Sequence, residues 1–119
     1  MKRLVLALIA FALLATPLLA GDAQIVDARA QKNGPTWSFS VTIAHGDTGW
    51  DHYADAWRVV TPSGEVLGTR TLHHPHVEEQ PFTRSLSGVA IPREVTEVLI
   101  EARDSVHGWS PKTFPIKLR

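Results

Sequence analysis

Apolar and polar side chains alternate with a period of two along most of this chain. In the clearest run, residues 36–44, Ser and Thr fall on one face and four apolar side chains on the other: Trp37, Phe39, Val41 and Ile43. This period is typical of a strand with one buried face. Similar runs recur between clusters of turn-forming residues. The pattern predicts strands over residues 23–30, 36–44, 54–61, 66–72, 82–86, 95–103 and 112–118.

Short strands separated by turn signals, with no helical periodicity, predict an all-β fold, a seven-stranded immunoglobulin-like sandwich of two sheets. The chain resembles the fibronectin type III variety of this sandwich. The resemblance is carried by Trp37 in the second predicted strand, Trp57 in the third, and a crossing from Leu86 to Pro92 that leads into the sixth. Both tryptophans are expected to belong to the core, because each lies in an alternating strand.

Residues 1–20 begin with Met-Lys-Arg and continue as an apolar run that ends at Ala20. This pattern is typical of a secretory signal peptide, and the apolar run is shorter than the roughly 20 residues of a membrane-spanning helix. We expect cleavage after Ala20, with Ala23 as the alternative. No cysteine follows the run, so we expect no lipid or membrane anchor after cleavage. Residues 21–119 then form one domain in the periplasm or outside the cell.

The charge balance excludes two classes of partner. Removal of the signal peptide, which contains Lys2 and Arg3, leaves 10 basic and 12 acidic side chains. Such a chain has no electrostatic reason to bind nucleic acid or an anionic membrane surface. The chain contains no cysteine, so it forms no disulfide, and its stability must come from the core.

All six histidines lie in three segments, residues 45–55, 72–82 and 104–109. Successive strands of a sandwich run in opposite directions, so the loops after the second, fourth and sixth strands should meet at one end. These loops are the three histidine segments, which we call the histidine pole. The opposite end receives ordinary turn residues. Because function concentrates in loops held by a rigid framework, we expect the functional site at the histidine pole.

Histidine with carboxylates, and without cysteine, suits Zn²⁺ or Cu²⁺. In the extended segment His74-Pro75-His76, the two imidazoles should point the same way. With His107, and with His45 or His52, they would form a four-ligand set. Carboxylates that could act as ligands or orient the imidazoles are Asp47, Asp51, Asp55, Glu78, Glu79 and Asp104.

Several of these residues also have a purely structural interpretation. His73, beside His74, is expected to be solvated. Asp51 and Asp55 could instead accept loop amides in Asx turns. The mature chain would begin with Gly21 or Gln24, so a copper site built on an amino-terminal histidine is excluded.

The loop aromatics allow two interpretations. Trp50 and Trp109 each follow a glycine in a segment predicted to be a loop. They could cap the core or, with Tyr53, present an aromatic platform to a ligand.

A second resemblance concerns the metal. His74-Pro75 followed by Glu78-Glu79, and His107-Gly108-Trp109, resemble the iron-binding motifs of superoxide reductases, which are immunoglobulin-like sandwiches. That family has a histidine where Gln80 stands, a cysteine where Asp104 stands and a methionine where His76 stands. The resemblance implies only His74 and His107 as metal ligands. The activity is not carried over, because the iron of that family requires a thiolate.

The sequence thus predicts an exported protein that binds Zn or Cu as a carrier, buffer or accessory. The alternative is a recognition module in which Trp50, Tyr53 and Trp109 hold a periplasmic partner protein, a peptide or a carbohydrate. An enzyme is the least favoured class, because no nucleophile stands in a recognisable motif.

Overall fold

Every regular element in the computed structural model, which describes residues 21–119, is a β-strand. The predicted signal peptide lies outside the described residues. Within residues 21–119 there is no helix of the length and apolarity needed to span a bilayer. The strands are β1 (Gln24–Asn33), β2 (Thr36–Ala44), β3 (Ala54–Val60), β4 (Val66–Thr71), β5 (Phe82–Val89), β6 (Glu97–Asp104), β7 (Gly108–Trp109) and β8 (Phe114–Lys117).

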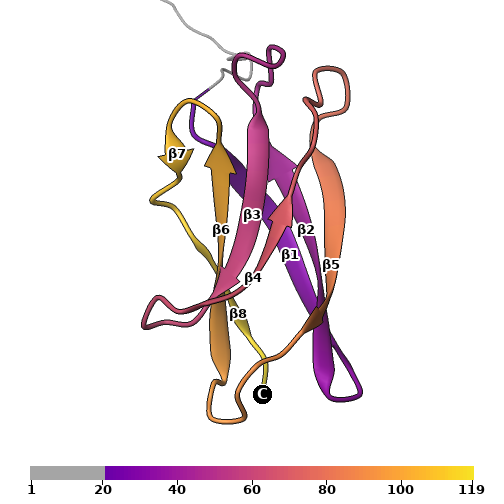
Figure 1. Cartoon of the computed structure of the whole chain (residues 1–119), viewed down its shortest axis with the longest axis vertical. Helices are drawn as coiled ribbons and strands as arrows, with labels where there is room; N and C mark the ends of the chain where they lie inside the picture. Colours follow the sequence, from indigo (N-terminus) through magenta and orange to yellow (C-terminus); the bar gives the residue numbers. More distant parts are fainter. Residues whose placement is uncertain (1–20) are drawn as a thin grey trace, which may run out of the picture.

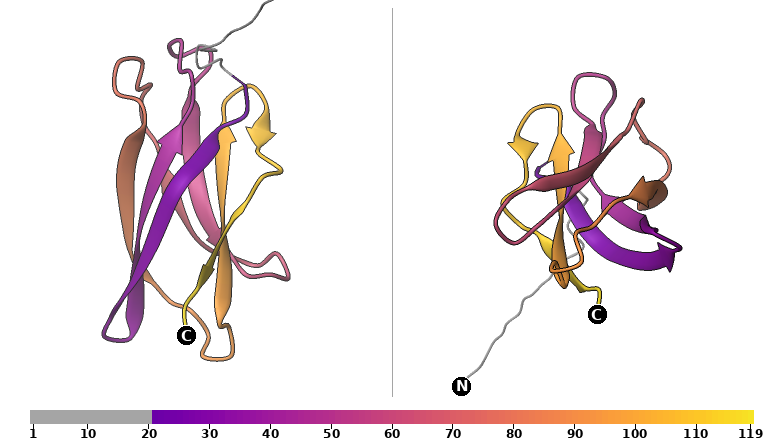
Figure 2. Two further views of the ribbon diagram at one scale, coloured as in Figure 1. Left: turned by 180° about the vertical axis from the view of Figure 1, so that it is seen from behind. Right: turned by 60° about the horizontal axis from the view of Figure 1, so that its bottom comes forward.

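The strands form two antiparallel sheets that pack face to face (Figure 1, Figure 2). One sheet has the order β1-β2-β5, and the other has the order β4-β3-β6-β7. The last strand, β8, also pairs with β6. Strand β7 pairs with the carboxyl end of β6, and β8 pairs with its amino end. The two short strands therefore share the same edge of β6.

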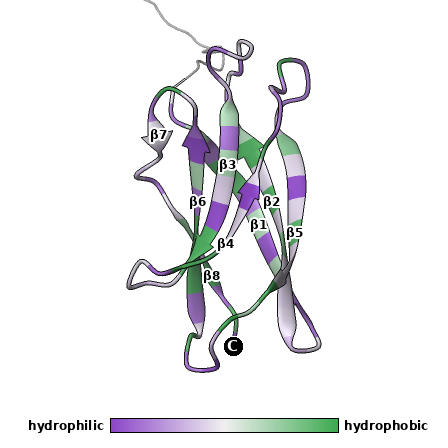
Figure 3. Ribbon diagram, in the orientation of Figure 1, coloured by the Kyte–Doolittle hydropathy of each residue, from purple (hydrophilic) through white to green (hydrophobic). Residues whose placement is uncertain are grey.

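The core lies between the sheets, where the apolar face of each strand is buried. Hydropathy alternates in bands along the strands (Figure 3), and β2 and β6 are buried at every second residue. The largest apolar side chains with almost no exposed surface are Trp57, Phe39, Phe82, Ile43 and Ile100. The period-two pattern therefore identified the inward face of these strands correctly.

Three of the predicted strands differ clearly from the observed ones. The first extends to Asn33, beyond its predicted end at residue 30. The strand predicted over residues 112–118 is shorter, because the edge of β6 is shared with β7, which the pattern missed. The placement of Trp109 in a loop is therefore wrong, since it pairs with Arg103 in β6. Gly108 has a φ of 77°, which lets the chain turn back after the loop and resume pairing. The fifth strand extends to Val89, beyond the predicted end.

The three histidine-bearing loops lie at the same end of the sandwich, at the top of Figure 1. The first described residues, Gly21 to Ala23, lie at this end as well, because β1 starts there (Figure 1). The turns between β1 and β2, β3 and β4, and β5 and β6 lie at the opposite end. The alternation of strand direction thus brings the histidine segments together as expected.

Candidate metal centre at the histidine pole

Asp47 connects two loops of the histidine pole from a fully buried position. Its Oδ1 accepts hydrogen bonds from the His45 Nδ1 at 2.5 Å and the Ala54 amide at 3.0 Å. Its Oδ2 accepts the His76 amide at 2.7 Å. The side chains of Asp47 and His45 are both completely shielded from solvent. One carboxylate therefore fixes the β2–β3 loop and attaches the β4–β5 loop to it.

His45 is held at both ring nitrogens. Its Nδ1 faces Asp47, and its Nε2 lies 2.9 Å from the carbonyl oxygen of Gly21. Both ring nitrogens therefore lie within hydrogen-bonding distance of an oxygen atom, which holds the ring in one orientation. Gln80 supports this arrangement by accepting the His45 amide and donating to the His76 carbonyl.

Asp104, at the end of β6, is the second buried carboxylate of the pole. Its Oδ1 accepts hydrogen bonds from His52 Nε2 at 2.9 Å, and from the amides of Val106 at 2.9 Å and His107 at 2.8 Å. The Nδ1 of His107 lies 3.1 Å from Oδ1 and 3.2 Å from Oδ2. The two amide bonds shape the β6–β7 loop as an Asx turn, while the contacts to imidazoles go beyond that structural role.

These contacts keep Asp104 ionised. Burial by itself would raise its pKa, but the amides of His107 and Val106, the His52 imidazole and the charge of His107 lower the pKa of Asp104 below its ordinary value. A buried carboxylate that stays negative is suited to receive a cation.

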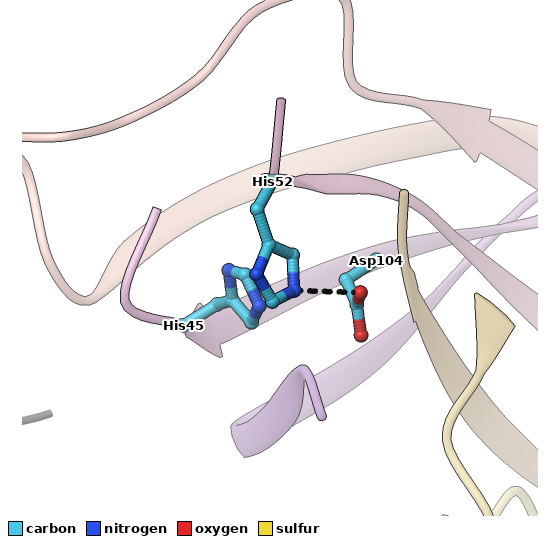
Figure 4. Close-up of side chains that lie close together, drawn as sticks. All are labelled: His45, His52 and Asp104. Carbon is cyan, nitrogen blue, oxygen red and sulfur yellow. Dashed lines mark hydrogen bonds and ion pairs between the residues drawn. The ribbon is translucent and has the colours of Figure 1, made fainter. Parts of the chain in front are cut away.

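Two groups of potential metal ligands share Asp104. In the inner group, one atom each of His45, His52 and Asp104 lies within 4.8 Å of the others. Figure 4 shows these side chains approaching one another, two from the β2–β3 loop and one from the end of β6. In the outer group, Asp22, Asp104 and His107 meet the same limit.

The imidazoles of the two groups are close to one another. The ring centroids of His45 and His52 are 4.8 Å apart, and those of His52 and His107 are 5.0 Å apart. Among the described residues, no Lys or Arg forms an ion pair with Asp22, Asp47 or Asp104. The pole around Asp104 is therefore rich in carboxylates and imidazoles and lacks a fixed cation, which favours a bound metal ion.

His74 and His76 form a separate pair, outside both groups. Their ring centroids are 4.7 Å apart, and the buried ring of His76 stacks on Phe82 at 3.9 Å. The Nε2 of His76 accepts a hydrogen bond from Arg84 Nη2 at 3.0 Å. Burial, the charge of Arg84 and the neighbouring His74 together lower the pKa of His76. Burial and the positive charge of Arg84, which disfavour a proton on His76, also disfavour a metal cation there.

The remaining predicted polar residues are scattered. Asp51, Glu78 and His73 are exposed to solvent. Glu79 pairs with Arg84 at 3.3 Å, and Asp55 pairs with Arg103 across β3 and β6. None of these five residues belongs to a ligand group found among residues 21–119.

The loop aromatics have separate environments. Trp50 is 67% exposed at the tip of the β2–β3 loop, and its ring meets that of Tyr53 edge-on at 5.6 Å. Trp109 lies under the guanidinium of Arg58, 3.7 Å from its ring centroid. Trp50 and Tyr53 therefore remain available to a ligand, whereas one face of Trp109 is covered.

Sequence reasoning missed three residues of the site, namely Gly21, Asp22 and Gln80. Gly21 and Asp22 reach the pole only because β1 starts at this end, and no local pattern in the sequence indicates that contact. The sequence gives Gln80 no role of its own, because it only replaces a histidine of the superoxide reductase motif. Its two hydrogen bonds form because the β4–β5 loop folds over the β2–β3 loop.

Comparisons with known proteins give one similar chain. A protein of Halomicrobium mukohataei described as "Putative lipoprotein" is 42% identical to this chain over 96 residues, which is 80% of this chain and 47% of the relative. The chain therefore spans about half the length of the relative it matches. No family model and no solved structure matches the chain.

Proposed function

We propose that the histidine pole binds a divalent transition-metal ion, Zn²⁺ or Cu²⁺, through His45, His52 and Asp104. The observation that carries this proposal is the approach of two imidazoles and an ionised carboxylate to within 4.8 Å of one another. Imidazole nitrogens and carboxylate oxygens are ligands that both ions accept.

The surroundings of His45 support the same reading. Imidazoles that bind metal usually donate their other ring N–H to a carboxylate, which fixes the orientation of the ring. Asp47 occupies that position at His45 Nδ1, so Nε2 is the nitrogen that would face the ion. Binding would replace the contact of Nε2 with the Gly21 carbonyl, while the buried contact of Nδ1 with Asp47 would persist.

Isothermal titration of Zn²⁺ into the protein, purified without a histidine tag, tests the proposal. The titration is best done at about pH 7.5, above the ordinary imidazole pKa of about 6.5, because only neutral imidazole binds metal. His52→Ala and Asp104→Asn should each weaken binding by at least about tenfold. His73→Ala is the matched control and should leave the affinity unchanged, because His73 is exposed and outside both groups.

The same titration distinguishes this site from the set predicted from the sequence, His74, His76 and His107. If His74→Ala and His76→Ala weakened binding while His52→Ala did not, the ion would lie at the β4–β5 loop and the proposed ligands would be wrong. If Zn²⁺ and Cu²⁺ did not bind at all, the metal proposal would fail as a whole.

The proposal places the metal-binding protein outside the cytoplasm, as a carrier, buffer or accessory. The apolar stretch at residues 1–20 and the description of the relative as a lipoprotein support export to a secreted or membrane-associated location. The strand order supports a sandwich of the fibronectin type III variety, because β4 pairs with β3 and not with β5.

Recognition of a partner protein is a second candidate function. Each of the three loops of the histidine pole exposes one large apolar side chain, Trp50 at 67%, Val77 at 55% and Val106 at 57%. Apolar side chains gathered at loop tips are typical of interaction sites. A photo-crosslinking residue at position 50 should then capture a defined partner in the exporting cell. The same residue at position 66, exposed at the opposite end, should not. Equal capture from both positions would contradict recognition by the pole.

A further inference from the structure

We propose that the histidine pole holds two divalent ions, with the carboxylate of Asp104 bridging them. This inference rests on the proposed function and adds a second site and a stoichiometry to it. The inner ion is the one held by His45, His52 and Asp104. The outer ion would be held by Asp104, His107 and Asp22, whose ligand atoms also lie within 4.8 Å of one another.

Asp104 contacts the imidazoles of both groups, as a bridging carboxylate would. Its Oδ1 lies 2.9 Å from His52 Nε2 and 3.1 Å from His107 Nδ1, and its Oδ2 lies 3.2 Å from His107 Nδ1. The centroids of these two rings are 5.0 Å apart. Paired ions in proteins are usually about 3.5–4 Å apart, a separation compatible with one ion bound by each of these two imidazoles.

The charge of the pole is also sufficient for two cations. Asp22, Asp47 and Asp104 contribute three carboxylates, and within residues 21–119 none of them is neutralised by a Lys or Arg. The β4–β5 loop is different, because Arg84 lies against His76 there.

The two positions differ in access to solvent, and this difference predicts unequal affinities. The side chains of His45 and Asp104 are fully buried and that of His52 is 15% exposed. Those of His107 and Asp22 are 43% and 45% exposed. Water competes better at the outer position, so the inner ion should be retained and the outer ion should exchange readily. A retained ion beside an exchangeable one suits a protein that passes metal to another molecule.

Metal analysis after equilibrium dialysis against Zn²⁺ tests the stoichiometry. The unchanged protein should bind two equivalents, and mild chelation should remove one before the other. Asp22→Asn and His107→Gln should each reduce binding to one equivalent. Both residues are exposed, so the fold should survive, and an unchanged thermal midpoint of the metal-free variants would show this. Asp51→Asn, an exposed carboxylate of the β2–β3 loop, is the matched control and should retain two.

Asp104→Asn should weaken both sites together, and paramagnetic resonance with Cu²⁺ should show two magnetically coupled ions. One equivalent in the unchanged protein, unaffected by Asp22→Asn and His107→Gln, would overturn the two-ion inference and leave the proposed function intact. Two uncoupled ions, of which Asp104→Asn removes only one, would also overturn it. Failure to bind any ion would overturn both.

Discussion

At the scale of single residues, two buried carboxylates determine how the histidine pole is built. Asp47 contacts the ring of His45 and accepts two loop amides. Asp104 contacts the rings of His52 and His107 and accepts the His107 amide. Removing the acceptor of a buried hydrogen bond leaves its donor unsatisfied. Both carboxylates are therefore expected to contribute to stability as well as to the site.

We expect Asp47→Ala to lower the free energy of unfolding by roughly 3–5 kcal/mol, because the His45 ring and two loop amides lose their buried partner and each unsatisfied group costs about 1–3 kcal/mol. Urea denaturation measures the change. Asp51→Ala, in the same loop but exposed, should change stability by no more than about 0.5 kcal/mol. Similar losses for both variants would show that Asp47 has no special role.

His76 should make stability depend on pH. Its pKa is lowered in the folded protein from 6.5, chiefly by burial and by Arg84. As pH falls below about 6.5, the unfolded chain takes up this proton before the folded chain does. The contribution of His76 is therefore complete above pH 6.5 and is lost as pH falls from there through the folded-state pKa.

Thermal melts of the metal-free protein in this window check the effect. His76→Gln, which keeps an acceptor for Arg84, should flatten the dependence of the midpoint on pH, whereas His73→Gln should leave it unchanged. An unaltered slope in His76→Gln would assign the pH dependence to other groups.

At the scale of elements, β2 is central to the three-stranded sheet and supplies much of the core. Its four inward side chains are buried, and it pairs with β1 on one side and β5 on the other. Trp37 begins this inward series at the end opposite to the histidine pole, with 7% of its surface exposed. Packing of the two sheets there does not depend on the metal site.

We therefore expect Trp37→Ala to reduce the free energy of unfolding by roughly 3–5 kcal/mol, as for other large aromatics removed from a packed core. Chemical denaturation monitored by circular dichroism measures this loss. Trp50→Ala removes the same type of side chain from an exposed loop and should have an effect below about 0.5 kcal/mol. The reverse order would contradict the assignment of the core.

At the scale of the whole molecule, the histidine pole joins segments that are far apart in the sequence. The start of the described chain, the β2–β3 and β4–β5 loops and the end of β6 are linked there by hydrogen bonds. A ligand set drawn from His45, His52 and Asp104 is complete only when both sheets are in place. Metal binding and folding should therefore be coupled.

Saturating Zn²⁺ should accordingly raise the thermal midpoint. An ion that binds only the folded state at a concentration of about 100 times its Kd adds about 2.7 kcal/mol to stability. Scanning calorimetry with and without Zn²⁺ measures the shift. The shift should vanish in His52→Ala and after addition of a chelator. An equal shift in His52→Ala would mean that the stabilisation comes from elsewhere.

The sequence alone determined most of the strands and the end of the molecule that carries the histidines. A strand with one buried face shows a period of two in consecutive residues, and strands that alternate in direction place every second loop at the same end. The strands predicted over residues 36–44 and 95–103 therefore agree with the structure to within two residues at each end, and the three histidine segments lie at one end as predicted.

Only the tertiary structure decided which of these histidines lie together. The sequence favoured His74 and His76 as metal ligands because an extended segment would point both rings the same way. In the structure their rings are close together, but Arg84 of β5 donates a hydrogen bond to His76, and its positive charge disfavours a metal ion there. The groups that share Asp104 instead need Asp22 from the start of the chain and His45 and His52 from another loop. The loops are held by long-range hydrogen bonds, such as that from the His76 amide to Asp47 and that from the His45 amide to Gln80. Hydrogen bonds at the pole join residues as far as 24 to 52 positions apart, so no local pattern can express them.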